Sequence, residues 1–278
     1  MKKTNQIETL TYDVVLPHDI AIIDNRYQVA ATSDNTRRAY QSDIRHFENW
    51  GGQLPATTKS ILCYLQAFAD KLNPRTLSRR ITAIKQWHRY QRFPDPTLDP
   101  VVAKTLTGIT RVHGKPKNKA APLLTADLIR ICEYLLNLKT LAALRDNALL
   151  QLGFLGAFRR SELVAIEVAN IKFSEEGVEI LIPHSKTDQE NTGQYCAIPY
   201  GNEKLCAVAA LKTWLEKADI QSGFIFRRIR KSDKISDLGI SAACVNDLVK
   251  KHAVAVGLEN AKDFSSPSMR RGLATTAS

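Results

Sequence analysis

The sequence predicts a mainly α-helical protein of two domains, the first entirely helical and the second α+β with a small antiparallel sheet. Three observations support this fold class. The length of 278 residues suits two domains of ordinary size. Apolar residues recur at helical spacing through residues 33–112. The period changes to that of short strands within residues 171–199, and helical spacing then resumes.

Four short helices are expected in the first domain, at residues 33–112, after an N-terminal extension of residues 1–32 without a clear period. A Ser-Asp-Asn-Thr start signal opens the first helix and a Gly-Gly pair ends it. Thr57 or Thr58 caps the second, and prolines bound the others. The expected helices cover about residues 34–50, 58–72, 75–92 and 101–112.

A basic linker, residues 113–122, leads into the second domain, residues 123–278. The linker alternates lysine with proline, glycine and asparagine and has no apolar period. Beyond it we expect a helix from Thr125, a buried apolar helix over 147–156 and a helix from Ser161. Three strands and two further helices follow, at residues 171–173, 178–183, 194–199, 202–217 and 240–256.

The composition argues against several classes of protein. No apolar run approaches the length of about 20 residues that a membrane span needs, and no secretory signal is visible. The five cysteines are scattered without metal-ligand spacing, which favours a reducing cytoplasm over a disulfide framework or a zinc site. GxGxxG, P-loop and HExxH motifs are absent, and we interpret the six isolated histidines as surface or packing residues. We therefore expect no metal and no cofactor.

Positive charge is concentrated in one stretch of the chain. The net charge is +11, and residues 71–119 contain twelve basic residues opposed only by Asp95 and Asp99. Such a field is typical of proteins that bind polyanions, although a solvated surface face would have the same composition.

The third expected helix separates its charges from its apolar residues. With a rotation of roughly 100° per residue, its cations fall within an arc of about 140°. These cations are Arg75, Arg79, Lys85, Arg89 and Arg92. The opposite side carries Leu77, Ile81, Ile84 and Trp87, and only Arg80 departs from this division. A solvated helix face normally includes glutamates, and this one has none, so we favour a face that binds the major groove and phosphates of DNA. The linker adds Lys115, Lys117 and Lys119 as candidate phosphate contacts.

The strongest local signal lies around Arg159. An apolar helix delivers this arginine just past a Gly-Ala break, and a new helix begins two residues later. An arginine beside buried elements is costly unless it holds an anion. Glu162, three residues on, is placed to orient it. The alternative interpretation is a purely structural arginine–glutamate pair.

Four motifs occur in a characteristic order. The first begins at Thr36 and reads Thr-Arg-Arg-Ala-Tyr. Arg159 lies in Gly-Ala-Phe-Arg-Arg-Ser-Glu-Leu, Lys186 in Pro-His-Ser-Lys-Thr-Asp, and Arg270 in Ser-Pro-Ser-Met-Arg-Arg-Gly. In this order they resemble the tyrosine recombinases, or phage integrases, near the Cre branch. The resemblance covers the chain from about residue 33 to its end.

The resemblance implies a fold and a site. The first domain is then a SAM-like core-binding domain and the second a recombinase catalytic domain, which together clamp duplex DNA. Arg159 and Arg270 correspond to the two catalytic arginines, Glu162 to the acidic residue that supports the first, and Lys186 to the hairpin lysine.

The family's reaction needs no metal. A tyrosine attacks the scissile phosphate, two arginines hold the non-bridging oxygens, and a lysine protonates the departing 5′-oxygen. The 3′-phosphotyrosyl bond lets the strands be rejoined. Members act on double-stranded DNA as homo-oligomers. The resemblance therefore implies a cytoplasmic, nucleoid-associated location and no membrane partner.

Two departures from the family pattern bear on activity. Pro267 stands where the family has a histidine, and it has no side-chain donor. No tyrosine follows Tyr200, whereas the family's nucleophile and a C-terminal docking helix lie downstream of the second arginine. We interpret Tyr195 and Tyr200 as packing residues. The chain is expected to be truncated at Ser278 and to bind DNA without completing strand exchange. Alternatives are a fragment of an active recombinase, a regulator or dominant-negative remnant that occupies recombination sites, or a nicking enzyme of the topoisomerase kind.

Overall fold

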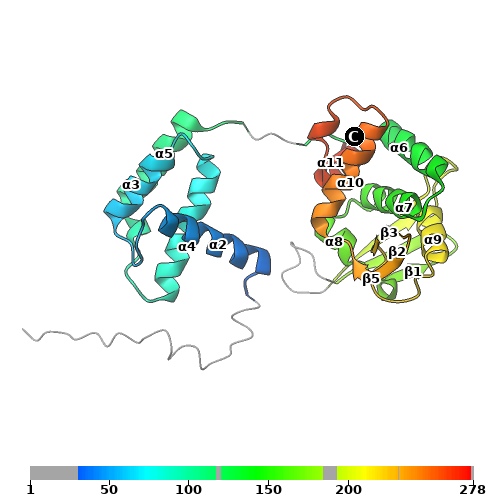
Figure 1. Cartoon of the computed structure of the whole chain (residues 1–278), viewed down its shortest axis with the longest axis horizontal. Helices are drawn as coiled ribbons and strands as arrows, with labels where there is room; N and C mark the ends of the chain where they lie inside the picture. The colour runs from blue at the N-terminus through cyan, green and yellow to red at the C-terminus, as the bar shows by residue number, and fades with distance from the viewer. Residues whose placement is uncertain (1–30, 117–119, 184–192, 231, 277–278) are drawn as a thin grey trace, which may run out of the picture. The chain divides into compact units, whose positions relative to one another are not determined.

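A computed structural model describes residues 31–116, 120–183, 193–230 and 232–276. The chain forms two compact units, residues 1–117 and 118–278 (Figure 1). Both are rich in helix, and the second also holds two small antiparallel sheets. The predicted fold class is confirmed.

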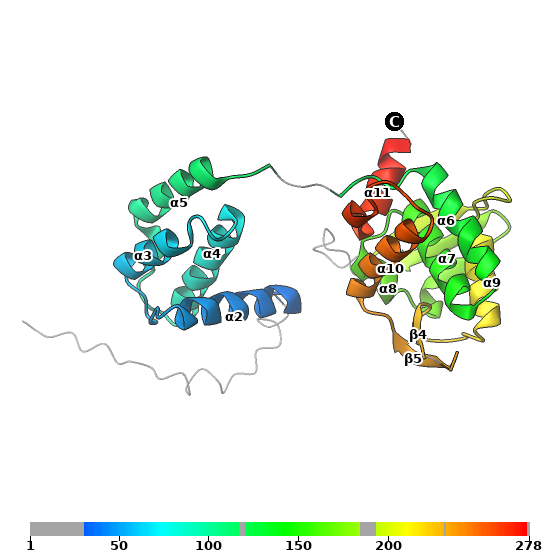
Figure 2. The same ribbon diagram turned by 45° about the horizontal axis from the view of Figure 1, so that its top comes forward.

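Four α-helices build the described part of the first unit, and polar caps begin each of them. They are α2 (Asp34–Asn49), α3 (Thr58–Phe68), α4 (Pro74–Tyr90) and α5 (Pro100–His113), with a 3₁₀ turn at η1 (Pro96–Leu98). The side chains of Ser33, Thr57, Asn73 and Asp99 each accept a hydrogen bond from a backbone N–H of the first turn, satisfying donors that a helix leaves open. Helices α2 and α4 pack against each other (Figure 2).

The core of the first unit comes from the predicted apolar stripes. Phe47, Ile61, Leu65, Leu77 and Ile84 have no solvent exposure. His88 is also fully buried, and it joins two segments because its Nε2 accepts from the backbone N–H of Ala56 while Nδ1 bonds the carbonyl of Ile84. The burial therefore follows the helical period of the sequence.

Two helix ends differ from the prediction. The second helix ends at Phe68, four residues earlier than expected, because residues 70–73 form a turn that leads into the Asn73 cap. Helix α4 ends at Tyr90, and Arg92 lies beyond it with a backbone φ of 58°. Arg92 therefore does not continue the helical arc in which the sequence analysis placed it.

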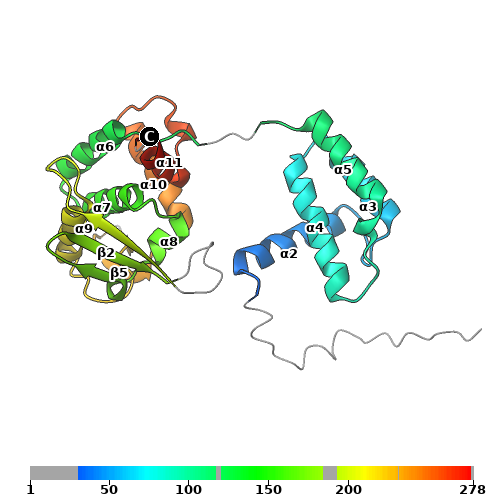
Figure 3. The same cartoon turned by 180° about the vertical axis from the view of Figure 1, so that it is seen from behind.

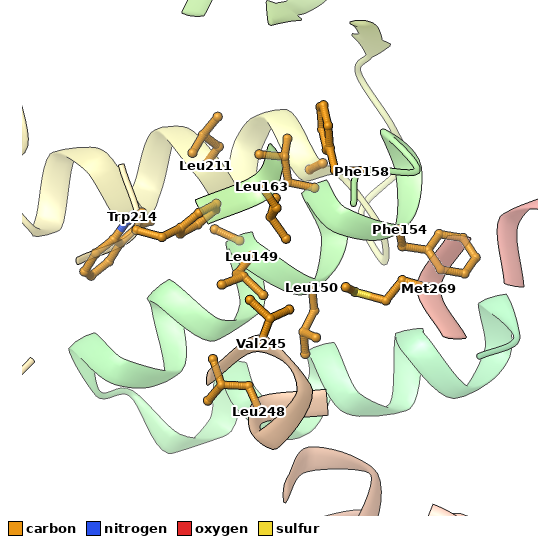
Figure 4. Close-up of a cluster of buried hydrophobic side chains, with 14 of the residues drawn as sticks. Leu149, Leu150, Phe154, Phe158, Leu163, Leu211, Trp214, Val245, Leu248 and Met269 are labelled. Atoms are coloured by element: carbon orange, nitrogen blue, oxygen red, sulfur yellow. The ribbon is translucent and has the colours of Figure 1, made fainter. Parts of the chain in front are cut away.

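Helix α7 is the centre of the second unit. The helices of this unit are α6 (Thr125–Leu138), α7 (Leu141–Leu155), α8 (Arg160–Ala165), α9 (Ala207–Lys217), α10 (Ala242–Ala255) and α11 (Ser266–Thr276), with short 3₁₀ turns at η2 (Val168–Asn170) and η3 (Ala261–Asp263). Nearly every residue of α7 is buried, as its all-round apolar sequence predicts. Helices α6, α9 and α11 contact α7, and α10 lies beside α11 (Figure 2). Met269 of α11 lies near Leu150 and Phe154 of α7 in the core (Figure 4).

Buried polar residues within α7 are paired with one another and with neighbouring elements. Arg145 binds Asp146 through Nε and Nη2, and its Nη1 donates to the carbonyl of Arg227. The second oxygen of Asp146 lies 2.9 Å from Nε2 of His252 in α10. Such pairing makes buried charge tolerable and fixes α10 against α7.

The main sheet has three antiparallel strands in the order β1 (Ile171–Phe173), β2 (Gly177–Ile182) and β3 (Gln194–Pro199). Its register pairs Ile171 with Ile180 and Leu181 with Tyr195. The sheet lies beside α9 (Figure 3). The predicted strands are present with bounds shifted by one residue at most.

Several elements of the second unit differ from the prediction. The hairpin of β4 (Arg227–Ile229) and β5 (Ile235–Gly239) is not predicted by the sequence pattern, because its strands are short and lack strict alternation. Helix α9 begins at Ala207, five residues later than expected, because residues 202–205 form a bridged turn. Among the described residues, no helix combines the length and apolar character of a membrane span.

Candidate functional site

Two of the predicted catalytic residues line one pocket of the second unit. The pocket has a volume of about 320 Å³, and Arg159 and Arg270 both contribute to its wall. Glu162 lines it as well, together with residues 156–158, Ile182 and residues 194–196 of β3. Two arginines from distant parts of the sequence therefore face the same space, which suits an anion.

Arg159 reaches the pocket through a sharp change of direction after α7. Gly156 ends this helix, and Ala157 has a φ of 48°, a left-handed conformation that an alanine adopts at a cost. Arg159 then precedes α8. Its backbone N–H donates to Glu162 Oε2 at 2.8 Å, and its Nη1 lies 2.6 Å from Oε1 of the same carboxylate. The strained turn and the carboxylate together hold the guanidinium in place.

The buried state of Glu162 makes this pair effective. Its side chain is 7% exposed, whereas that of Arg159 is 30% exposed. One carboxylate thus caps the start of α8 and binds the guanidinium, so the predicted pairing of the two side chains is present. The pairing alone does not distinguish a phosphate-binding arginine from a structural one.

Helix α11 brings Arg270 to the pocket. Arg270 is exposed, while the adjacent Met269 is fully buried in the core. Gly272 lies against the backbone of Leu123, where a Cβ would come within 1.8 Å of the carbonyl oxygen, so only glycine fits this approach. The N–H of Leu123 donates to the carbonyl of Ser268, and Arg271 Nη1 donates to the carbonyl of Ala120. These contacts fix the position of α11.

Pro267 occupies the first turn of α11, as its fixed φ allows. Its side chain is exposed, and Asn246 of α10 accepts a hydrogen bond from the N–H of Ser266 at 2.9 Å. The local helix is therefore present with proline at this position, as predicted.

Strand β3 supplies the remaining wall of the pocket. Cys196 donates to the carbonyl of Gly156 at 3.7 Å, and burial raises the pKa of its thiol. The interpretation of Tyr195 as a packing residue is wrong, because 65% of this residue is exposed and it lines the pocket. Tyr200 is 41% exposed and contacts Lys212, whose Nζ lies 2.5 Å from the phenolic oxygen. Tyr195 occupies an outward-facing position of β3, and Tyr200 lies just beyond the end of this strand.

Lys186 lies in residues 184–192, outside the described residues. The placement of Arg159, Glu162 and Arg270 around one pocket is thus the part of the predicted site that the structure describes.

The predicted cationic face lies on α4 of the first unit, and its basic residues are accessible to solvent. Arg75, Arg79 and Arg89 are exposed and Lys85 is partly exposed. Lys115 is exposed beyond α5, and Lys117 and Lys119 lie outside the described residues. Over α4 itself, no acidic residue interrupts this face.

Arg79 has a partner that the sequence pattern does not indicate. The buried carboxylate of Asp43 in α2 accepts one hydrogen bond from Nε of Arg79 and one from its Nη2, both at 2.8 Å. This pair raises the pKa of Arg79. Arg80, the residue out of place on the helical wheel, lies in the same cluster, 3.5 Å from Asp43 and within hydrogen-bonding distance of Tyr64 and His46. Asp43 lies four residues before the core residue Phe47, which is the only sequence signal for its burial.

Among the described residues, no group of three or more histidine, cysteine or carboxylate side chains is arranged to hold a metal ion.

Comparison with known proteins decides the family. Residues 124–277 match the phage integrase family, and residues 27–92 match the phage integrase N-terminal SAM-like domain. The chain belongs to the phage integrase family. Tyrosine recombinases make up this family, so the predicted recognition is confirmed at that level, and its Cre-like branch remains a prediction.

Relatives within the family include Xer recombinases. The chain is 38% identical over 254 residues to an integrase/recombinase XerD homolog of Selenomonas ruminantium, covering 88% of this chain and 74% of that protein. It is 25% identical over 233 residues to the tyrosine recombinase XerC of Staphylococcus aureus strain MSSA476, covering 80% and 71%.

Two solved integrases share the fold. The Tn1549 transposon integrase in complex with transposon right end DNA superposes with a TM-score of 0.62 at 14% identity, covering 90% of this chain and 83% of that one. A lambda integrase dimer bound to a COC′ core site gives 0.58 at 17% identity, covering 90% and 67%. At these identities the likeness concerns the fold alone.

Proposed function

We propose that this chain binds duplex DNA and holds one phosphodiester in the pocket of the second unit. The observation that carries the proposal is that Arg159, at the start of α8, and Arg270, in α11, line the same pocket. Family membership and the DNA-bound state of the lambda and Tn1549 integrases support it. The helical unit, residues 33–112, contacts DNA through the cationic face of α4, with the linker, residues 113–122, contributing its lysines.

The two arginines act on the non-bridging oxygens of the phosphate. A guanidinium offers paired N–H donors that match two oxygens, and its charge stabilises the negative charge that develops during phosphoryl transfer. The Glu162 carboxylate accepts hydrogen bonds from the backbone N–H and from Nη1 of Arg159, and so fixes the orientation of the guanidinium. We assign Lys186, by the family resemblance, as the donor of a proton to the departing 5′-oxygen.

The first test removes the pocket arginines singly. Arg159→Ala and Arg270→Ala are each expected to weaken binding to a fluorescein-labelled duplex by about tenfold, the size of a lost charge-assisted hydrogen bond. Anisotropy titration at fixed salt measures the dissociation constants. Arg160→Ala is the matched control, because this exposed neighbour is not among the residues lining the pocket. Equal affinity of all three variants and the unsubstituted protein would refute the phosphate site.

A polypeptide of these 278 residues is further proposed to bind DNA without completing strand exchange. Pro267 provides no imidazole for proton transfer, and each of the eight tyrosines lies at or before position 200. With a nicked suicide duplex, we expect binding in a native gel and no protein–DNA adduct in a denaturing gel. A covalent adduct that resists detergent would overturn this proposal, and mapping the linked residue would identify the nucleophile.

A further inference from the structure

The pairing of Asp43 with Arg79 has the geometry of an orienting contact. Both hydrogen bonds are 2.8 Å long and engage the Nε–Nη2 edge of the guanidinium. The carboxylate side chain is 1% exposed, whereas the arginine side chain is 51% exposed. A fixed, buried acceptor thus holds one edge of an otherwise accessible guanidinium.

Asp43 is itself held in place by a polar cluster beneath α4. Arg80 Nε lies 3.5 Å from Asp43 Oδ1, and the Arg80 side chain is only 12% exposed. Nη1 of Arg80 lies 3.0 Å from the Tyr64 oxygen and 2.7 Å from His46 Nδ1. The cluster joins α2, α3 and α4. Asp43 contacts two arginines of α4, and one of them, Arg80, is held in turn by Tyr64 of α3 and His46 of α2. The buried carboxylate is therefore a fixed acceptor to which Arg79 adapts.

Arg79 keeps donors for a second partner. A guanidinium has five N–H donors, and the pair with Asp43 engages two of them. The other three belong to Nη1 and Nη2, at the accessible end of the side chain. Arg75 lies one turn before Arg79 on α4, and both are exposed. The accessible edge of Arg79 therefore belongs to the cationic face.

We infer that Asp43 is a positioning residue for DNA binding, which fixes Arg79 so that its accessible edge meets a phosphate of the backbone. This inference rests on the proposed function, in which the cationic face of α4 contacts DNA. An arginine that is ordered before binding loses less side-chain entropy when it contacts phosphate. Asp43 thus strengthens binding although its charge has the same sign as DNA.

The opposing interpretation makes the contrary prediction. If Asp43 only neutralised Arg79, its removal would add one net positive charge beneath the face and tighten DNA binding. If Asp43 positions Arg79, its removal weakens binding despite the added charge. The sign of the change therefore separates the two roles.

The experiment measures affinity for a fluorescein-labelled mixed-sequence duplex at several salt concentrations. Asp43→Asn keeps the shape and removes the charge, and we expect it to weaken binding about three- to tenfold with the salt slope unchanged. Arg79→Ala removes a cation, and we expect its slope to fall by about one. In the Arg79→Ala background, Asp43→Asn should weaken binding no further, because it acts through that arginine.

A second variant covers the case in which Asp43→Asn fails to fold. Arg79→Lys changes an accessible side chain and keeps the charge, but an ammonium cannot form the paired contact with Asp43. We expect it to weaken binding to a similar extent with an unchanged salt slope. Unchanged affinity of Arg79→Lys, or tighter binding by Asp43→Asn, overturns the inference.

Arg89→Ala separates failure of the inference from failure of the proposed function. This residue lies on α4 and is exposed. If Arg89→Ala weakens binding while Asp43→Asn does not, the face binds DNA and only the positioning role is wrong. If neither Arg89→Ala nor Arg79→Ala changes the affinity or the salt slope, α4 is not the DNA surface. The positioning inference then fails together with the α4 part of the proposed function, while the pocket arginines have their own test.

Discussion

Each unit of the molecule contains an arginine held by a buried carboxylate, and the two pairs are built differently. In the second unit, Arg159 and Glu162 are three residues apart at the start of one helix. In the first unit, Arg79 and Asp43 lie on different helices, α4 and α2. The Arg159–Glu162 pair is a local structure, whereas the Arg79–Asp43 pair exists only when two helices pack.

The depth of the carboxylates also differs. Asp43 is 1% exposed and shared by two arginines, whereas Glu162 is 7% exposed and also caps its own helix. A local pair can form whenever its helix forms, but a tertiary pair reports the packing of the whole unit. Substitutions of the two carboxylates should therefore differ in how much they lower the free energy of unfolding and in how much of the unit they affect.

The largest effect is expected for Asp43→Ala. It leaves Arg80 with a buried charge and no carboxylate, a change that typically costs about 3–5 kcal/mol of the free energy of unfolding. Urea titration with hydrogen exchange of α2, α3 and α4 peptides measures this loss. Asp34→Ala, at an exposed carboxylate of the same helix, is the control and should cost less than about 0.5 kcal/mol. A loss for Asp43→Ala as small as that of the control would show that the cluster does not stabilise the unit.

A smaller, more local effect is expected for Glu162→Ala. It removes the cap of α8 and the partner of a guanidinium that remains 30% exposed to water, so we expect a loss of about 2 kcal/mol. Faster amide exchange should be confined to residues near α8. Glu176→Ala, at an exposed turn, is the matched control. Destabilisation spread over the whole second unit would contradict the distinction between local and tertiary pairs.

The smallest effect concerns pH and belongs to the first unit. Burial lowers the pKa of His46, and Arg80 lowers it further, against an opposing contribution from Asp43. Because the unfolded chain takes up a proton at higher pH than the folded one, stability should be complete above the ordinary histidine value of about 6.5 and fall below it. Thermal melting between pH 7 and pH 5 measures this fall. His46→Gln should remove that part of the pH dependence, and an unchanged profile would exclude His46 as its source.

Local patterns in the sequence are sufficient to predict most of the fold and one of the two arginine–carboxylate pairs. The helix start at Ser33, the cap at Thr57 and the burial of α7 follow from neighbouring residues alone. The pairing of Arg159 with Glu162 follows from spacing within one helix. Asp43 could not be predicted as a partner of Arg79, because a contact between two helices depends on how they pack.

The same limit explains the other differences from prediction. The sequence predicts a helix as far as Arg92, because nothing in the basic pattern marks the end of α4 at Tyr90. Residue type alone predicts packing for Tyr195, whereas its position in β3 turns it outward. The meeting of Arg159 with Arg270 followed from the family resemblance, and no periodicity in the sequence indicates it.

The approach of Gly272 to Leu123 has a mechanical consequence. Residues 120–123 are tied to α11 by the backbone bond from Leu123 to Ser268 and by the bond from Arg271 to Ala120. The polypeptide thus enters the second unit against the helix that bears Arg270. A substitution that disturbs this entrance segment therefore acts on the placement of Arg270 through α11.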